Sequence, residues 1–341
     1  MRWRTNKKYV DFRNEQIELQ VNWRERQEIG KEYGSQNGKT RPWIVPKSEW
    51  EKTIWLELRK DLLNYLLKED VQHHIGVHNL LSSWILCSNL YFGAYINDGF
   101  RELFRQFLEK KLEVNIDVIN KIYLEFAMDS DLSPTNLLGE PEGKRGSGQT
   151  SPDVAVDLSS GKENILLLIE CKYTEHSFYN CSGRKSKIKS GLVPNPKPER
   201  CINKETIMDF KNNCHQILWG RKYWNFIKIS EYGKKNLIKC PASVGGYQLI
   251  RQQALAEGIL LSGKFNKVFS CVAYDGRNES LMSAMKLTGI NSIKKEWENF
   301  FDIKSKFIVW EHQEWVEYVR KNKRKQFEKD WIKYISERYS I

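Results

Sequence analysis

The chain has 341 residues, of which 40% are hydrophobic and 12% are aromatic, a composition that excludes a disordered protein. Lys and Arg outnumber Asp and Glu by 55 to 43, which gives a formal net charge of +12. This excess favours a polyanionic partner such as nucleic acid, because cations that neutralise phosphates release condensed counterions.

The sequence shows no sign of secretion or of a membrane partner. The first residues, MRWRTNKKYVDF, lack the apolar segment of a secretory signal, and no stretch approaches the ~20 apolar residues of a membrane span. The seven Cys are odd in number and form no CxxC pair, so we expect reduced thiols and a cytoplasmic location. A zinc site is not favoured, because no common ligand spacing fits the nearest candidates, Cys181, Cys201, Cys214 and His215.

The first part of the chain, residues 1–75, is predicted to be a helical region. Residues 11–33 and 48–69 have the hydrophobic spacing of amphipathic helices, and Ser48 is a suitable cap for the second. The polar segment between them is predicted to be a loop, because it contains two Gly and two Pro residues.

The largest part, residues 76–310, is predicted to be a sheet flanked by helices. Residues 79–111 form a long apolar helical region with an interruption at 97–99. The following elements, in chain order, are strands at 119–128, 153–158 and 164–173, a helix at 242–262 and a strand at 267–276. This order predicts an α/β fold with a central mixed β-sheet. A basic irregular insertion lies at about 178–205, and residues 311–341 are predicted to be a basic helical segment.

The strand at 164–173 ends on two charges, although the run ILLLI before them is apolar on both faces. Glu170 and Lys172 are two residues apart, so both side chains lie on the same face of the sheet. The segment SSGKE is short enough to join the strands at 153–158 and 164–173 as a hairpin, which places Asp153 roughly level with Glu170. Two carboxylates and an ammonium are therefore expected to meet at one edge of the sheet.

This arrangement is suited to metal-dependent cleavage of a phosphodiester. Adjacent carboxylates repel each other, and Mg²⁺ relieves the repulsion while it accepts one or two carboxylates and a substrate phosphate. Asp153 and Glu170 are the predicted metal ligands, and the carbonyl of Cys171 is a further candidate oxygen ligand. Lys172 is placed to orient or deprotonate a water molecule and to stabilise charge on phosphorus.

The residues Pro152-Asp153 and Glu170-Cys171-Lys172 resemble the motif of the PD-(D/E)XK nuclease superfamily, which has the restriction-endonuclease-like fold. The resemblance covers about residues 79–276 and implies that Asp153 and Glu170 bind Mg²⁺, for which Mn²⁺ can substitute. Many members add an upstream acid, for which Glu125 is preferred over Glu102. The resemblance to a bacterial restriction endonuclease branch further implies that Gln248 and Gln252 lie near the site and contact DNA.

Basic side chains follow the proposed catalytic strand directly. Between Ser182 and Lys204, seven Lys or Arg residues stand against a single acid. Such a segment can follow a phosphate backbone, and the predicted DNA contacts in it are Arg184, Lys185, Lys187, Lys189 and Arg200. A second cluster between Arg320 and Lys333 fits a solvated helix face as well as it fits a DNA contact.

The sequence therefore predicts a Mg²⁺-dependent DNA endonuclease, most simply a type II restriction endonuclease or a related bacterial defence nuclease. Double-stranded DNA is the expected partner, and cleavage of both strands favours a homodimer. Two alternatives stay open. One is a nuclease of the same fold that acts in repair, recombination or transposition, and the other is a non-catalytic nucleic-acid-binding protein.

Overall fold

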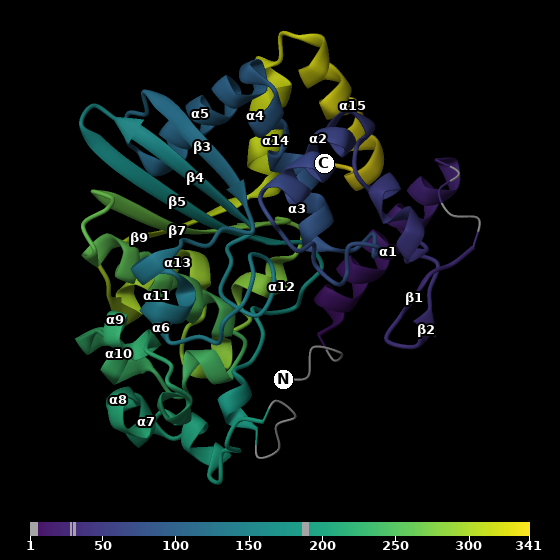
Figure 1. Cartoon of the computed structure of the whole chain (residues 1–341). Helices are drawn as coiled ribbons and strands as arrows, with labels where there is room; N and C mark the ends of the chain where they lie inside the picture. Colours follow the sequence, from purple (N-terminus) through teal and green to yellow (C-terminus); the bar gives the residue numbers. More distant parts are fainter. Residues whose placement is uncertain (1–5, 28, 30–31, 186–190) are drawn as a thin grey trace.

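A computed structural model describes residues 6–27, 29, 32–185 and 191–341. Within these residues a mixed five-stranded sheet lies between two layers of helices, as the sequence predicted (Figure 1). The strands are β3 (Val118–Leu124), β4 (Val154–Ser160), β5 (Glu163–Lys172), β7 (Lys267–Tyr274) and β9 (Lys306–Glu311), and they pair in that order. The pairs β3–β4 and β4–β5 are antiparallel, whereas β5–β7 and β7–β9 are parallel.

Strand β5 is buried on both faces because a helical layer covers each side of the sheet. Leu167 belongs to the core under α3 (Ser83–Tyr91), α5 (Asp98–Leu112), α14 (His312–Asn322) and α15 (Gln326–Tyr339). Leu166 and Leu168 belong to the opposite core, under α11 (Tyr247–Leu261) and α13 (Ile293–Phe300). A strand that is covered on both sides is apolar at every position, which accounts for the run ILLLI.

The N-terminal region differs from its predicted form in three places. Helix α1 (Lys7–Arg26) begins and ends earlier than expected, and the second predicted helix is divided into a 3₁₀ turn at Lys47–Thr53 and helix α2 (Leu56–Lys68). Asn89 accounts for the break, because its side-chain oxygen accepts a hydrogen bond from the backbone N–H of Trp55 at 2.8 Å. The predicted loop contains a small hairpin of β1 (Ser35–Gln36) and β2 (Lys39–Thr40).

Short elements complete the fold around the sheet. They are α4 (Gly93–Ile96), α6 (Pro134–Leu138), α7 (Lys204–Met208), α8 (Phe210–Asn213), α9 (Tyr223–Phe226), β6 (Lys228–Ile229), α10 (Glu231–Asn236), α12 (Glu279–Met282) and β8 (Phe301–Asp302). Helix α1 lies beside α15, so the first and the last helix of the described chain pack together (Figure 1). Among the described helices, none combines the length and the apolar character that crossing a lipid bilayer requires.

The interruption predicted at 97–99 is confirmed. Helix α4 ends at Ile96, and Asn97 has extended backbone angles and caps α5 by accepting a hydrogen bond from the Phe100 N–H at 2.9 Å.

We expect Asn97→Ala to lower the free energy of unfolding by about 1 kcal/mol, because the helix loses its side-chain cap. Asn97→Asp keeps an oxygen acceptor and should stay close to the wild type. Urea unfolding of the three proteins measures the difference, and equal midpoints for the Ala and Asp variants would contradict the capping role.

Candidate active site

The hairpin of β4 and β5 brings the predicted charges together. Val154 pairs with Ile169 and Ser160 pairs with Glu163, so Asp153 lies level with Glu170 at the end of the ladder. The turn between the strands contains Gly161 with φ of +58°, a backbone conformation that favours glycine. The register expected from the sequence is therefore the observed one.

Glu170 is the centre of the contacts in the site. Its Oε1 atom lies 2.5 Å from the Lys172 Nζ and accepts a second hydrogen bond from the Gln248 Nε2 at 2.9 Å. Asp153 approaches from β4, where its Oδ2 accepts a hydrogen bond from the Cys171 N–H at 2.6 Å. Lys172 and Glu170 are only 2% and 7% exposed, so this is a buried ion pair and not a frayed surface contact.

The electrostatics of the site are those of crowded, buried charges. Burial raises the pKa of Asp153 well above its usual value, and the nearby charge of Glu170 raises it further. Burial on its own would lower the pKa of Lys172, but Glu170, Glu175 and Asp153 outweigh burial and the net shift is upward. Lys172 is therefore a cation at neutral pH in the metal-free protein.

Glu125 is the upstream acid that the fold brings to the site. Glu125 is the first residue after β3, and its backbone N–H donates a hydrogen bond to the Asp153 carbonyl at 3.0 Å. Its φ of +49° lies outside the range of a β-strand, so its side chain does not follow the alternation of β3. Burial raises the pKa of Glu125 well above its usual value, with further contributions from Asp153 and Glu170, while a hydrogen bond from Trp84 opposes the shift. Glu102, the other candidate, is exposed on α5 and pairs with an arginine of its own helix.

The residues fit a magnesium ion better than they fit a softer metal. Among the described residues, no group of three or more His, Cys, Asp and Glu side chains is arranged to hold a metal. Mg²⁺ does not need such a cage, because it uses one or two carboxylates and keeps several waters. The Gln248 Oε1 atom is buried without a hydrogen-bond partner in the described chain, which leaves an oxygen for an ion-bound water. The Cys171 carbonyl lies on the Asp153 side of β5, because the N–H and C=O of a strand residue point the same way.

Gln248 and Gln252, which were predicted together, lie in different surroundings. Gln248 contacts Glu170 at the start of α11, as expected. Gln252 lies one turn further along the helix, is 1% exposed, and donates hydrogen bonds to Ser270 and to the Cys271 carbonyl. The prediction that Gln252 contacts DNA is therefore corrected, because its amide is enclosed beneath the sheet.

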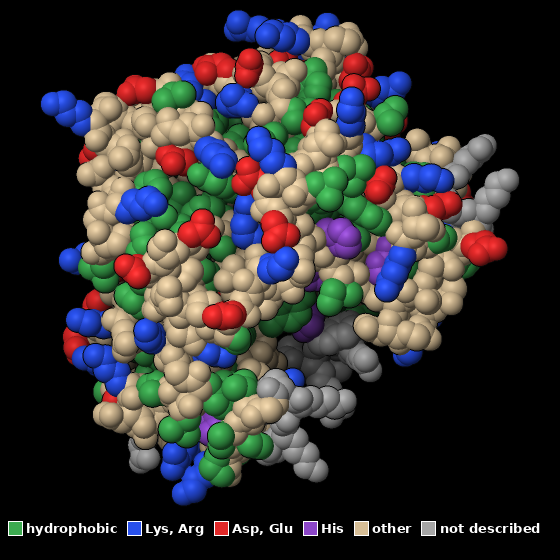
Figure 2. Space-filling view, in the orientation of Figure 1, with side chains coloured by type: hydrophobic (Ala, Val, Ile, Leu, Met, Phe, Trp, Pro, Cys, Tyr) green, Lys and Arg blue, Asp and Glu red, His purple; other side chains and the backbone are tan. Residues whose placement is uncertain are grey.

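The predicted basic contacts are only partly within the described structure. Lys185 and Arg200 are exposed, as is Arg184, whose Nη1 donates to the Ser243 carbonyl at 2.9 Å. Lys187 and Lys189 lie outside the described residues. Figure 2 shows Lys and Arg side chains scattered among acidic ones over the visible face, with a basic group over the turn between α14 and α15.

Residues from distant parts of the chain complete a polar cavity of about 700 Å³ around the carboxylates. Tyr9 and Arg13 come from α1, Asn37 comes from the β1–β2 turn, and Gly146 and Gln149 come from the loop before Asp153. The sequence analysis described the helix and loops that contain these residues but did not predict that any of them lines the site. No local sequence pattern indicates such a position, because only the packing of α1 and the hairpin against the sheet brings these residues to the site.

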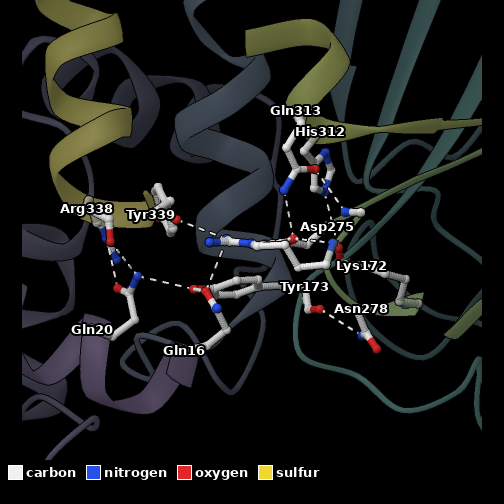
Figure 3. Close-up of polar contacts among 12 residues, drawn as sticks. Gln16, Gln20, Lys172, Tyr173, Asp275, Asn278, His312, Gln313, Arg338 and Tyr339 are labelled. Atoms are coloured by element: carbon white, nitrogen blue, oxygen red, sulfur yellow. Dashed lines mark hydrogen bonds and ion pairs between the residues drawn. The ribbon is translucent and has the colours of Figure 1, made fainter. Parts of the chain in front are cut away.

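A buried chain of hydrogen bonds fixes the backbone of Lys172. The Lys172 carbonyl accepts the N–H of Asp275 at 3.1 Å and lies 3.2 Å from the His312 Nε2 (Figure 3). Burial lowers the pKa of His312 to about 4, so the ring is neutral and Nε2 carries the proton. Its Nδ1 then accepts from the hydroxyl of Tyr91, which itself accepts from Trp310.

The same network joins both ends of the chain to the catalytic strand. Tyr173 donates to Gln16 of α1 at 3.1 Å, and Gln20 donates to the Arg338 carbonyl of α15 at 3.0 Å (Figure 3). Arg277 bonds to Gln16 as well, at 3.2 Å. The position of Lys172 thus depends on helices at opposite ends of the sequence.

The mixed sheet between two helical layers, with acids and a lysine where β4 begins and β5 ends, is an α/β restriction-endonuclease-like core. The sequence model of one family, described as Restriction Endonuclease associating with ARP, matches residues 16–340. The chain belongs to this family, and membership indicates a restriction-type nuclease. No curated protein and no solved structure matches the chain.

Metal binding at this site should appear as thermal stabilisation. We expect Mg²⁺ or Mn²⁺ to raise the melting temperature of the wild type, because a ligand that binds only the folded state stabilises it. Asp153→Asn and Glu170→Gln should lose this shift, whereas Glu102→Gln should keep it. Differential scanning fluorimetry with and without EDTA makes the comparison, and a full shift in the Asp153 variant would place the metal elsewhere.

Proposed function

We propose that this protein is a Mg²⁺-dependent DNA endonuclease of the PD-(D/E)XK type, most simply a type II restriction endonuclease or a related defence nuclease. The observation that supports this best is the meeting of Asp153, Glu170 and Lys172 at the junction of β4 and β5. A surface salt bridge would explain Glu170 and Lys172, but it would not explain why Asp153 is held beside them in a polar cavity.

In this proposal Asp153 and Glu170, with the Cys171 carbonyl, hold the metal. Mg²⁺ supplies a Lewis acid for the scissile phosphate when it is bound, and Mn²⁺ can take its place. Glu125 adds negative charge beside Asp153 and strengthens the hold on the cation. Gln248 keeps Glu170 oriented through the hydrogen bond to Oε1.

Lys172 stabilises the negative charge that develops on the phosphate oxygens. Its ammonium is fixed by the ion pair with Glu170 and carries its charge at neutral pH, so it needs no reorganisation during the reaction. Once a cation neutralises the neighbouring carboxylates, Lys172 is also close enough to orient an attacking water molecule.

Double-stranded DNA is the proposed partner, and a homodimer is the proposed assembly. The net charge of +12 and the exposed Lys185 and Arg200 beyond the catalytic strand support a polyanionic ligand. Cutting both strands of a symmetric site is simplest for two copies related by a two-fold axis.

We expect Asp153→Ala and Glu170→Ala to abolish plasmid cleavage in Mg²⁺, because each removes a metal ligand. Lys172→Ala should lose about 10² to 10³-fold in turnover for one stabilising group. Lys172→Arg should also be impaired, because the guanidinium keeps the charge but differs in shape and donor geometry from the ammonium.

Lys267→Ala is the matched control for these variants. Lys267, the first residue of β7, forms a half-exposed ion pair at 2.6 Å with Glu163, the first residue of β5, at the end of the sheet opposite to Lys172. A solvent-accessible pair of this kind contributes only ~0 to 1 kcal/mol. Near-normal cleavage by Lys172→Ala at saturating Mg²⁺ and DNA would rule out the proposed mechanism.

The basic insertion should make DNA binding depend steeply on salt. We plot the logarithm of the DNA-binding constant against the logarithm of the salt concentration. Neutralising Lys185, Lys187 and Lys189 together is expected to make the slope of this plot less steep by ~0.9 for each phosphate contact that is lost. The same change at Lys321, Arg324 and Lys325 should leave the slope unchanged, because the α14–α15 turn lies far from the site in Figure 1. Fluorescence anisotropy over a salt series measures both slopes, and an unaltered slope in the first variant removes the insertion from the interface.

A further inference from the structure

The proposed catalytic groups lie on the floor of the cavity. Lys172 is 2% exposed, while Tyr179, whose ring centre lies 5.9 Å from the Lys172 Nζ, is 53% exposed. Tyr179 has φ of +57°, an unusual conformation for a non-glycine residue. Backbone hydrogen bonds from Phe178 to Gly245 at 2.7 Å and from Tyr247 to Tyr179 at 3.1 Å hold this segment in place. An aromatic ring is thus fixed directly over the catalytic ammonium.

Two walls of the cavity are attached to the catalytic strand itself. Thr174 lies two residues beyond Lys172, and its carbonyl accepts a hydrogen bond from the Tyr9 hydroxyl at 2.7 Å. The Thr174 hydroxyl donates to the Leu81 carbonyl at 3.2 Å. Helix α1 and the segment before α3 are therefore joined to the floor through one residue.

The wall formed by the β1–β2 hairpin is equally well anchored. The Asn79 side chain donates a hydrogen bond to the Gln36 side chain at 3.0 Å. The backbone N–H of Val45 bonds to the His78 carbonyl at 2.9 Å, and the Val45 side chain belongs to a small buried core. Arg24, which is 2% exposed, donates to the carbonyls of the chain around the hairpin, including that of Ile44 at 3.2 Å. Moving this wall outward would break buried hydrogen bonds and open the small core, so it is not a loose lid.

The loop at 146–149 forms the remaining wall and is also fixed. Arg145 donates to the Glu125 carbonyl at 3.0 Å and to the Leu124 carbonyl at 2.7 Å. Gly146 has φ of +81° and packs so closely that a Cβ atom would lie 2.2 Å from the Gln72 carbonyl oxygen. Hydrogen bonds and close packing among the described residues therefore hold these walls around the floor.

We infer that the strand to be cut enters this cavity unpaired, as a single strand from a melted, frayed or gapped region of DNA. This inference rests on the proposed nuclease function and restricts cleavage of double-stranded DNA to regions where the two strands are locally separated. A cavity of about 700 Å³ has the volume of a small-molecule pocket and accepts one or two nucleotides, not the width of a duplex.

The lining of the cavity suits unpaired nucleotides in particular. Rings of Tyr9, Trp84, His176 and Tyr179 line it, and every base has a flat face that can stack on an aromatic ring. A base stacked on Tyr179 places its phosphate close to Lys172 and to the carboxylates. Arg13 on the wall provides a cation for a neighbouring phosphate.

The test compares one labelled sequence as a single strand, as an intact duplex and as a duplex with an internal unpaired bubble. In Mg²⁺ the wild type should cut the single strand and the bubble at least about 10-fold faster than the intact duplex, because they spare the free energy of opening base pairs. Cleavage of the intact duplex at the rate of the bubble would overturn the inference.

Binding in metal-free buffer, measured by fluorescence anisotropy, gives a second readout that does not need catalysis. Tyr179→Ala should weaken single-strand affinity about 5-fold or more through loss of stacking, and Tyr179→Phe should recover most of it. Tyr232→Ala is the matched control, because Tyr232 is 49% exposed on α10 and does not line the cavity.

The outcomes separate the two proposals. If no form of DNA is cut, the nuclease function fails, and the strand preference is then decided by affinity alone. A second outcome is that DNA is cut, that the wild type binds the duplex at least as tightly as the single strand, and that Tyr179→Ala and Tyr232→Ala bind the single strand with equal affinity. In that case the single-strand inference fails while the nuclease function stands.

Discussion

The buried ion pair between Lys172 and Glu170 is the interaction on which the site depends. A single charge buried among the core residues of β5 would cost several kcal/mol. The strand can carry Glu170 near its end because Lys172 and Gln248 contact the carboxylate. Asp153 then adds a negative charge that no protein cation fully offsets, and burial raises its pKa. When Asp153, Glu125 and Glu170 are all ionised, their charge exceeds that of Lys172, and a divalent cation would relieve the excess.

The rest of the fold keeps that ion pair in one position. The continuous antiparallel pairing of β4 and β5 sets Asp153 opposite Glu170. Hydrogen bonds from Asp275, which follows β7, and from His312 of α14 hold the carbonyl of Lys172. The terminal helices are part of this support, since Gln16 of α1 bonds to the residue that follows Lys172. Segments that look like appendages in the sequence are therefore structural supports of the active site.

Family and geometry contribute different parts of the functional argument. The family match covers nearly the whole chain and indicates a restriction-type nuclease, but it names no catalytic atom. The geometry is the basis of the proposed catalytic atoms, because Asp153, Glu170 and Lys172 meet in a polar cavity. The cavity walls are the basis of the inferred preference for an unpaired strand, which neither the family description nor the motif contains.

The sequence by itself determined the local features: the apolar strand β5, the hairpin register that sets Asp153 level with Glu170, and the interruption of the helical region at 97–99. These follow from short-range rules of hydrophobic pattern and turn length, so the order of strands from β3 to β7 and the α/β class were predictable. Only the tertiary structure decided which distant segments enclose the site, and it showed Gln252 to be buried although it shares a helix face with Gln248. Burial and wall contacts depend on packing between residues far apart in the chain, and no local spacing encodes them.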